Sequence, residues 1–386
     1  MSDTATPKVV PEAVEPPSFR AQALSISLVT VAFLIMTVVI ASFIWPIERY
    51  ESAPGRALSV MRRLSVSNTD RPVYEPDDGI RFVTALGTEL TALQSFMGWV
   101  DPYVGVLTCE QRFGRCEPGL SDQIQLGAMA TAKEIAAYVA LSYVGIEATL
   151  VEGPAQVAGF DADLCPEDAP DRRACRVLEI GDVIVSVDVG RGSVRIDKVS
   201  DLGEVLSQAR PGDVAELVVR SFDQEETERR VDVELLASPE DPNRTLIGFN
   251  PRDTRTVSLP FDIDIDTASI GGPSAGLSFT LALIDLLTPG DLMPSGGVAA
   301  TGTISAGGEV GPIGFLVQKL VAVKQSGVRY FIVPESQGEP AIEEIRRIAG
   351  DDVVVIVVGT LDDAIDALVE LGGVAPPSRA DATARS

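Results

Sequence analysis

An apolar run from Ala275 to Leu287 restricts the fold of this chain, because it carries apolar side chains almost all round a helix and must be buried. The turn before it, Gly271 to Ser274, suits a tight entry into that helix. Glycine reaches backbone angles closed to other residues, and proline fits a first helical turn. We therefore expect Ser274 at the mouth of a buried helix, where free backbone N–H groups and the positive helix end can stabilise an oxyanion.

A serine hydroxyl is a weak nucleophile and needs a base. The chain contains no histidine, which excludes a Ser/His/Asp arrangement and leaves lysine, whose amine acts as a base if desolvation lowers its pKa. Moving that pKa from about 10.4 to near 7 takes about 5 kcal/mol of differential burial. The surroundings of the lysine must therefore be apolar.

Two lysines, Lys319 and Lys324, share a predicted helical stretch over 315–325. The helical face of Lys319 is apolar, with Phe315 four residues before it and Ala322 and Val323 after it. Lys324 lies near the predicted helix end, which favours a solvated cation. Lys319 is therefore the candidate base.

Three segments around these residues resemble the proteolytic domain of the Lon family, and more closely the membrane-anchored Lon-like peptidases that carry a PDZ domain. They are Gly272–Gly276, Thr301–Ile304 in the family's central strand, and Gly311–Gly314 leading to Lys319. The resemblance covers residues 250–372 clearly. It implies that Ser274 is the nucleophile, that Lys319 is its base, that Thr301 orients the lysine, and that the chain forms a homo-oligomer, a hexameric ring.

One departure from the family pattern is Phe315, which stands where many relatives have a second glycine. It leaves the geometry of the loop before Lys319 open.

The N-terminal region predicts a membrane anchor. Residues 1–20 are polar and proline-rich, as in a disordered cytoplasmic tail. Residues 21–45 are uncharged and mostly apolar, long enough for a transmembrane helix. A cleaved signal peptide is the alternative, but Ala41–Phe43 is a poor cleavage site. We expect a single-pass signal anchor, followed over 46–145 by a juxtamembrane segment and the first part of the Lon-like domain.

Four cysteines fall into two close pairs, Cys109 with Cys116 and Cys165 with Cys175. Such spacing in an extracytoplasmic domain indicates two local disulfides, although four cysteines allow three pairings. A zinc site is disfavoured, because neither pair has the usual spacing and no histidine is available. Four free thiols in a cytosolic protein are the remaining alternative. We expect a cell-membrane protein whose catalytic domain is extracytoplasmic.

Residues 146–238 resemble a PDZ domain inserted within the Lon-like domain. The part of the Lon-like domain before the insertion is predicted to contain a strand over 79–90, a turn over 96–106 and a helix over 122–144. The candidate nucleophile follows the insertion. The predicted strands are 148–152, 183–187, 215–220 and 230–236, with a short helix over 202–208. The resemblance implies binding of extended peptide ends by strand addition. The residues of a peptide groove cannot be read from the sequence.

The C-terminal part, 239–372, is predicted to be the proteolytic domain that holds the dyad. It starts with a polar connector over 239–256 and a strand over 261–266 that alternates apolar residues with three aspartates. A solvated acidic strand face is favoured there over a metal site. Strands and helices then alternate to residue 371, which indicates an α/β domain, and 373–386 reads as a disordered tail.

Composition excludes several partners. The net charge of −25 and the pI near 4.3 argue against nucleic acid. No phosphate-binding loop of the GxxxxGK[ST] type occurs, so we expect no ATP, and no cofactor or metal.

The sequence thus predicts an α/β (α+β) proteolytic domain with an inserted, mainly-β PDZ domain and one N-terminal transmembrane helix. The expected function is ATP-independent serine endopeptidase action on unfolded or membrane-released polypeptides, with the PDZ domain recruiting or gating the substrate. A catalytically idle PDZ scaffold and an enzyme that cleaves only itself are the alternatives.

Overall fold

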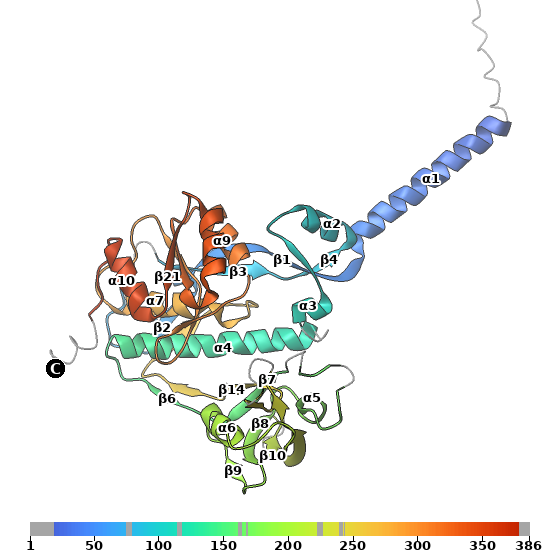
Figure 1. Cartoon of the computed structure of the whole chain (residues 1–386). Helices are drawn as coiled ribbons and strands as arrows, with labels where there is room; N and C mark the ends of the chain where they lie inside the picture. The colour runs from blue at the N-terminus through green and yellow to red at the C-terminus, as the bar shows by residue number, and fades with distance from the viewer. Residues whose placement is uncertain are drawn as a thin grey trace, which may run out of the picture.

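The structure is a computed structural model that describes residues 19–74, 79–113, 118–160, 164–166, 169–221, 227–238, 242 and 244–377. Two lobes lie on either side of the long helix α4 (Pro118–Tyr143), and helix α1 (Phe19–Ile44) projects away from both (Figure 1). Most of the two predicted disordered tails, 1–18 and 378–386, lies outside the described residues.

The larger lobe is built on a seven-stranded sheet of order β21-β20-β17-β3-β1-β4, with β5 also paired to β1. Strands β17, β20 and β21 are parallel to one another, β17 is parallel to β3, and β1 is antiparallel to its neighbours. The bounds are β1 Pro46–Ser59, β3 Arg81–Leu86, β4 Glu89–Thr91, β5 Gly105–Thr108, β17 Val298–Ala300, β20 Tyr330–Pro334 and β21 Val354–Val358.

Helices cover both faces of this sheet. One core holds Phe82 and Ala300 together with α4, α7 and α10, and the other holds Val83 and Ala299 with α8 and α9. The alternation follows from the period of two along a strand, which sends neighbouring side chains to opposite faces. The bounds are α7 Gly276–Leu287, α8 Leu316–Gln325, α9 Glu339–Ala349 and α10 Leu361–Glu370. The predicted α/β order of the C-terminal part is confirmed.

The smaller lobe has its own sheet, of order β11-β10-β8-β7-β14 with β9 paired to β8, and its own core around Val157, Ile184 and Leu217. Its elements are β7 Ala155–Gly159, α5 Ala174–Val177, β8 Val183–Asp188, β9 Val194–Arg195, α6 Val199–Leu206, β10 Val214–Arg220, β11 Glu228–Glu234 and β14 Asn250–Asp253. The predicted strands at 183–187, 215–220 and 230–236 and the helix at 202–208 are present. The PDZ assignment stays a prediction.

Three sequence predictions differ from the structure. Residues 96–106 are not simply a turn, because α2 (Ala92–Val100) extends into this segment. The helix starts with a capping box in which Thr91 and Gln94 satisfy each other's backbone N–H groups. The connector 239–256 contains β14 and two buried residues of the smaller core, Ile247 and Phe249. Strand β6 (Thr149–Val151) pairs with β15 (Thr256–Ser258), outside the sheet of the smaller lobe.

The remaining two-stranded ladders are β2 (Leu64–Ser67) with β16 (Asp262–Ile265), β12 (Leu236–Ala237) with β13 (Thr245–Leu246), and β18 (Thr303–Ile304) with β19 (Val310–Gly311). The predicted strand over 261–266 is therefore confirmed as β16, with its aspartates exposed. Three further short helices are η1 (Met61–Arg63), α3 (Cys109–Phe113) and η3 (Glu335–Gln337).

The predicted membrane anchor, 21–45, coincides with α1. Among the described residues, no helix has both the length and the apolarity that crossing a membrane requires. The transmembrane helix is therefore not confirmed.

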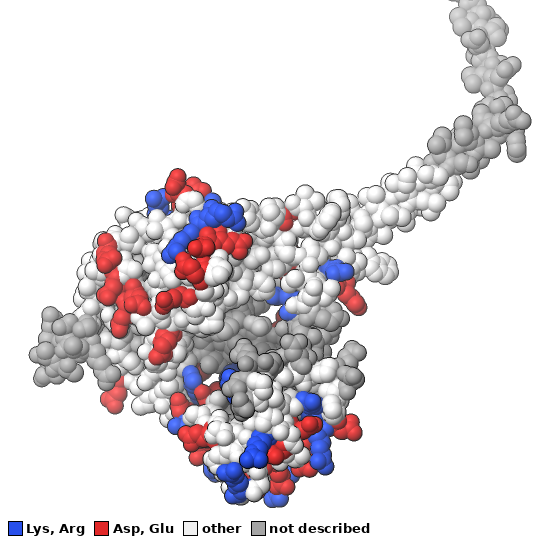
Figure 2. Space-filling view, viewed as in Figure 1, with Lys and Arg blue, Asp and Glu red and all other residues white. Residues whose placement is uncertain are grey.

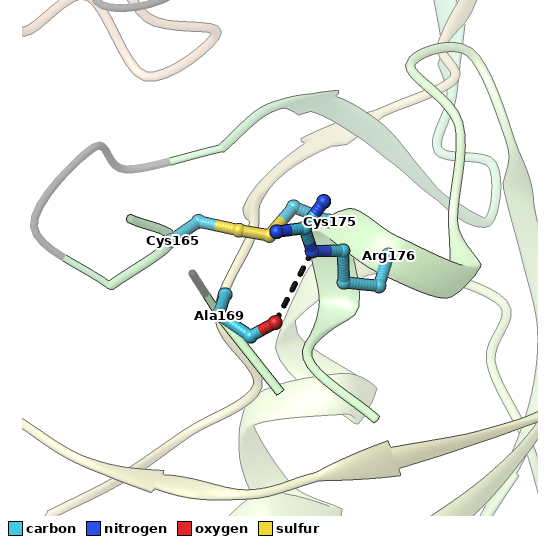
Figure 3. The surroundings of a disulfide bond; sticks show 4 residues. All are labelled: Cys165, Ala169, Cys175 and Arg176. Carbon is cyan, nitrogen blue, oxygen red and sulfur yellow. Dashed lines mark hydrogen bonds between the residues drawn. A yellow bond between two sulfur atoms is a disulfide. The ribbon is translucent and has the colours of Figure 1, made fainter. Parts of the chain in front are cut away.

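Cys165 and Cys175 form a disulfide in the smaller lobe, with their Cα atoms 6.3 Å apart (Figure 3). Next to it, Nε of Arg176 donates a hydrogen bond of 3.2 Å to the carbonyl oxygen of Ala169. Cys109 is buried and disulfide-bonded, and Cys116 lies outside the described residues.

Candidate active site

Ser274 lies in a single 3₁₀ turn, η2 (Pro273–Ala275), that leads directly into α7. The turn rests on α4. The backbone N–H of Gly272 donates a 2.8 Å hydrogen bond to the carbonyl of Gln125, and a Cβ added to Gly271 would come within 3.0 Å of the backbone carbon of Gln125. Gly272 has φ of 91°, in the region that favours glycine. The two glycines therefore let α4 approach the turn closely.

The helix after the turn is buried from Gly276 to Leu286, as the sequence predicts. Its first residues are tied to the end of the central strand β17, because Ser278 Oγ donates to the carbonyl of Ala300 at 2.7 Å and the Leu277 N–H donates to that of Gly302 at 3.1 Å. These bonds hold η2 and the start of α7 against the carboxyl end of β17.

Thr301 lies immediately after β17, not inside the central strand as the resemblance implies, and it is fully buried. Its N–H donates to Ile332 of β20 at 3.0 Å. Its hydroxyl donates to the carbonyl of Ser274 at 3.1 Å, and the N–H of Gly302 donates to the same carbonyl at 2.8 Å. Sheet and turn therefore share one hydrogen-bond network at this point.

Lys319 reaches the same point from the opposite face of the sheet. Its Nζ lies 2.7 Å from Oγ of Ser274 and 3.1 Å from Oγ1 of Thr301. Only 4% of its surface is exposed, and burial lowers its pKa to about 7. The structure thus brings together the three residues that the sequence singles out. Lys319 lies 45 positions after Ser274 and 18 positions after Thr301 in the chain.

Lys324 takes no part in this network. Its Nζ lies 3.1 Å from Oδ2 of Asp352 and donates to the carbonyl of Ile348 at 2.7 Å. It is a partly exposed cation at the end of α8, bonded rather than simply solvated as the sequence predicts, and its partners hold it away from Ser274.

The loop before α8 contains the departure at Phe315. This residue has φ of 61°, a left-handed backbone, directly before the helix that carries Lys319. The guanidinium of Arg112 lies 4.6 Å from the centroid of the Phe315 ring. Sequence reasoning missed Arg112 and Gln125 because their contacts with the loops around the site come from distant elements and leave no local pattern.

In the part of the chain that the structure describes, no group of histidine, cysteine, aspartate or glutamate residues could hold a metal ion. The reactive groups that the described geometry brings together are the hydroxyl of Ser274 and the buried amine of Lys319.

Comparisons with known proteins find sequence similarity over the segment that contains Ser274, Thr301 and Lys319. Residues 265–370 match the family described as Lon protease (S16) C-terminal proteolytic domain. The Lon proteases of Lachnoclostridium phytofermentans and Geobacter metallireducens are each 35% identical to this chain, over 94 and 107 residues. These cover 24% and 28% of this chain and 11% and 13% of those proteins.

Lon protease 2 of Sorangium cellulosum is 30% identical over 138 residues, which are 36% of this chain and 16% of that protein. The chain thus spans only a small part of the curated relatives that it matches. Residues 265–370, which hold Ser274, Thr301 and Lys319, are similar to the C-terminal proteolytic domain of Lon proteases.

Proposed function

We propose that this chain is a serine endopeptidase in which Ser274 is the nucleophile and Lys319 its base. The observation that carries the proposal is the 2.7 Å distance between Lys319 Nζ and Ser274 Oγ, made by a lysine whose pKa burial lowers to about 7. At neutral pH a large fraction of such an amine is unprotonated and can accept a proton.

In the proposed reaction, neutral Lys319 takes the hydroxyl proton of Ser274 while Oγ attacks the carbonyl carbon of the scissile peptide. Backbone N–H groups of η2 stabilise the resulting oxyanion. The ammonium of Lys319 then gives its proton to the leaving amine, and an acyl enzyme remains. Water then gives a proton to the same lysine and attacks the acyl carbon. The lysine passes this proton to Oγ as the acyl bond breaks, which releases the second product and restores the hydroxyl of Ser274.

The test compares the full chain with Ser274→Ala and Lys319→Met on unfolded casein. Each change removes one half of the pair, so we expect kcat to fall by about 10³-fold or more. Lys324→Met is the matched control, because it removes a lysine of the same helix that does not touch Ser274, and its activity should stay near that of the wild type. Undiminished cleavage by Ser274→Ala would disprove the mechanism. No cleavage by the wild type would favour the scaffold alternative.

We further propose that the activity is independent of ATP and acts on unfolded or membrane-released polypeptides. The support is the lack of a phosphate-binding loop in the sequence. Addition of ATP and Mg²⁺ should leave the rate on casein unchanged and should not enable cleavage of a stably folded protein. Stimulation of either rate by ATP would contradict this proposal.

The smaller lobe, in this proposal, is a PDZ domain that recruits or gates the substrate. Its separate sheet and core support a unit with its own task. Free C-terminal peptides should change the rate of casein cleavage if they occupy this lobe. A rate insensitive to all such peptides would contradict a role in substrate handling.

Assembly and location are proposed as well. The resemblance to Lon-like peptidases supports a homo-oligomeric ring. Sedimentation velocity of the full chain in detergent would test this, and a monomer would contradict it.

The Cys165–Cys175 disulfide supports an extracytoplasmic position at the cell membrane. Protease added outside intact cells, after removal of any cell wall, should digest the larger lobe, and full protection would place it inside.

A further inference from the structure

An exposed apolar surface lies at the base of α1. Helix α2 packs against the C-terminal end of α1 and against β4 and β5 (Figure 1). Gly98 is its only buried residue and lies against Val104 and Val106. The helix contains no charged residue, and Phe96, Met97, Trp99 and Val100 are exposed on it.

Both tryptophans of the chain are on this surface. Trp45, which follows α1, is 73% exposed, and Trp99 on α2 is 81% exposed. In Figure 2 the surface over α2 and the adjoining end of α1 is almost entirely white. Exposed apolar patches of this kind mark contact surfaces, and indole rings favour the boundary between lipid and water, where an apolar ring and a polar N–H are both satisfied.

The exposed residues of α1 indicate whether lipid or another protein covers this surface. From Phe33 to Met36, four consecutive residues of α1 expose large apolar side chains, and four consecutive positions span a full turn. A helix that is apolar all round is covered either by the core of a large protein or by lipid, and α1 projects away from both lobes of this protein (Figure 1). The net charge of −25 would repel an anionic surface, so neutral or zwitterionic lipid is the matching chemistry.

We propose that α2 and Trp45 form an interfacial surface that embeds in the headgroup region of a zwitterionic bilayer and holds the larger lobe against it. The surface comprises Trp45, Phe96, Met97, Trp99 and Val100. It is independent of the peptidase proposal, because none of these residues belongs to the network around Ser274.

Two single-tryptophan variants of the full chain test this proposal. Trp45→Phe leaves Trp99 as the only indole, and Trp99→Phe leaves Trp45. On addition of phosphatidylcholine vesicles, the emission of each should shift to shorter wavelength. Lipids brominated near the headgroup should quench it more than lipids brominated near the chain ends, and salt at about 1 M should not reverse the effect, because the contact is apolar.

Trp99 emission that does not change with vesicles, and that stays fully quenchable by aqueous iodide, would overturn the proposal. So would a blue shift that appears without lipid and grows with protein concentration, which would assign the surface to a second copy of the chain.

A matched pair of variants in the Trp45→Phe background completes the test. Phe96→Ser with Met97→Ser should reduce the lipid quenching of Trp99, whereas Val194→Ser, an exposed apolar position in the smaller lobe, should leave it unchanged. Equal quenching in both would count against α2 as the contact. Casein cleavage measured on the same samples separates this outcome from failure of the peptidase proposal.

Discussion

The hydroxyl of Thr301 sets the direction of the hydrogen bonds around Lys319. Because it donates its proton to the Ser274 carbonyl, it can only accept from the amine. An N–H of Lys319 is thereby directed at Thr301, and in the neutral amine the lone pair is left for the hydroxyl of Ser274. Thr301 is thus a positioning residue in the proposed reaction.

The pH dependence of the reaction follows from the pKa of about 7 that burial gives Lys319. The proposed base works only when unprotonated, so kcat/KM should rise with pH through about 7 and level off above about 8. The measurement is cleavage of an unfolded peptide between about pH 5 and 9. A flat profile would contradict a lysine base.

The same burial means that Lys319, when protonated, lowers the free energy of unfolding. Its pKa is lowered in the folded state, so the cost is fully present below about pH 7 and disappears as pH rises towards the unfolded value of 10.5. Lys319→Met should therefore raise the free energy of unfolding at pH 6, by about 5 kcal/mol at most. Urea denaturation should show this gain shrinking towards pH 10, and a variant less stable than wild type at pH 6 would contradict the cost.

Substitution of Thr301 tests positioning apart from folding. Thr301→Val keeps the shape and removes the hydroxyl, so kcat should fall by about 10- to 100-fold with KM little changed. Thr301→Ser restores the hydroxyl and should recover most of kcat. A serine variant as slow as the valine variant would show that the methyl group, and hence packing, is what matters.

At the scale of elements, the backbone at the start of α8 sets the orientation of the helix that carries Lys319. Phe315 enters the helix with a left-handed backbone, a conformation that costs a residue with a Cβ about 1 to 2 kcal/mol. The guanidinium of Arg112 over its ring offsets part of this cost, since such contacts contribute about 0.5 to 2 kcal/mol. The chain thus keeps the loop conformation that glycine would adopt more readily.

Two replacements of Phe315 separate these contributions. Both Phe315→Ala and Phe315→Gly lose the ring contact, but only glycine relieves the backbone, so the glycine variant should be the more stable by about 1 kcal/mol. Val317, inside α8, is the matched control, and there alanine should be more stable than glycine by a similar amount. Thermal unfolding checks both pairs, and the same order at both positions would contradict the role of the left-handed turn.

At the scale of the whole molecule, two lobes lie on either side of α4, and the Cys165–Cys175 disulfide lies in the smaller lobe. Joining Cys165 to Cys175 closes a loop of sequence separation 10, which stabilises the fold by about 3 kcal/mol in the chain-entropy model. Cys165→Ala, Cys175→Ala and the double variant should each lose about this much in urea unfolding, because any one change opens the loop. Additive losses would show that packing of the thiols dominates.

Much of this architecture follows from local pattern. The buried helix after Ser274, the apolar face of Lys319 and the alternation of strands and helices near the C-terminus are readable because burial leaves a periodic pattern in the sequence. The same patterns indicate the strand over 261–266 and the long helix over 122–144.

Other features depend on contacts between distant segments, which leave no such trace. The helix at α2, the buried half of the connector after Ser238 and the left-handed turn at Phe315 are examples. The distances among Ser274, Thr301 and Lys319 belong here too, because they exist only once α7 and α8 pack on opposite faces of the sheet at the end of β17. The sequence singles out Ser274, Thr301 and Lys319 as candidates, and the packing of helices on the sheet places them within hydrogen-bond distance.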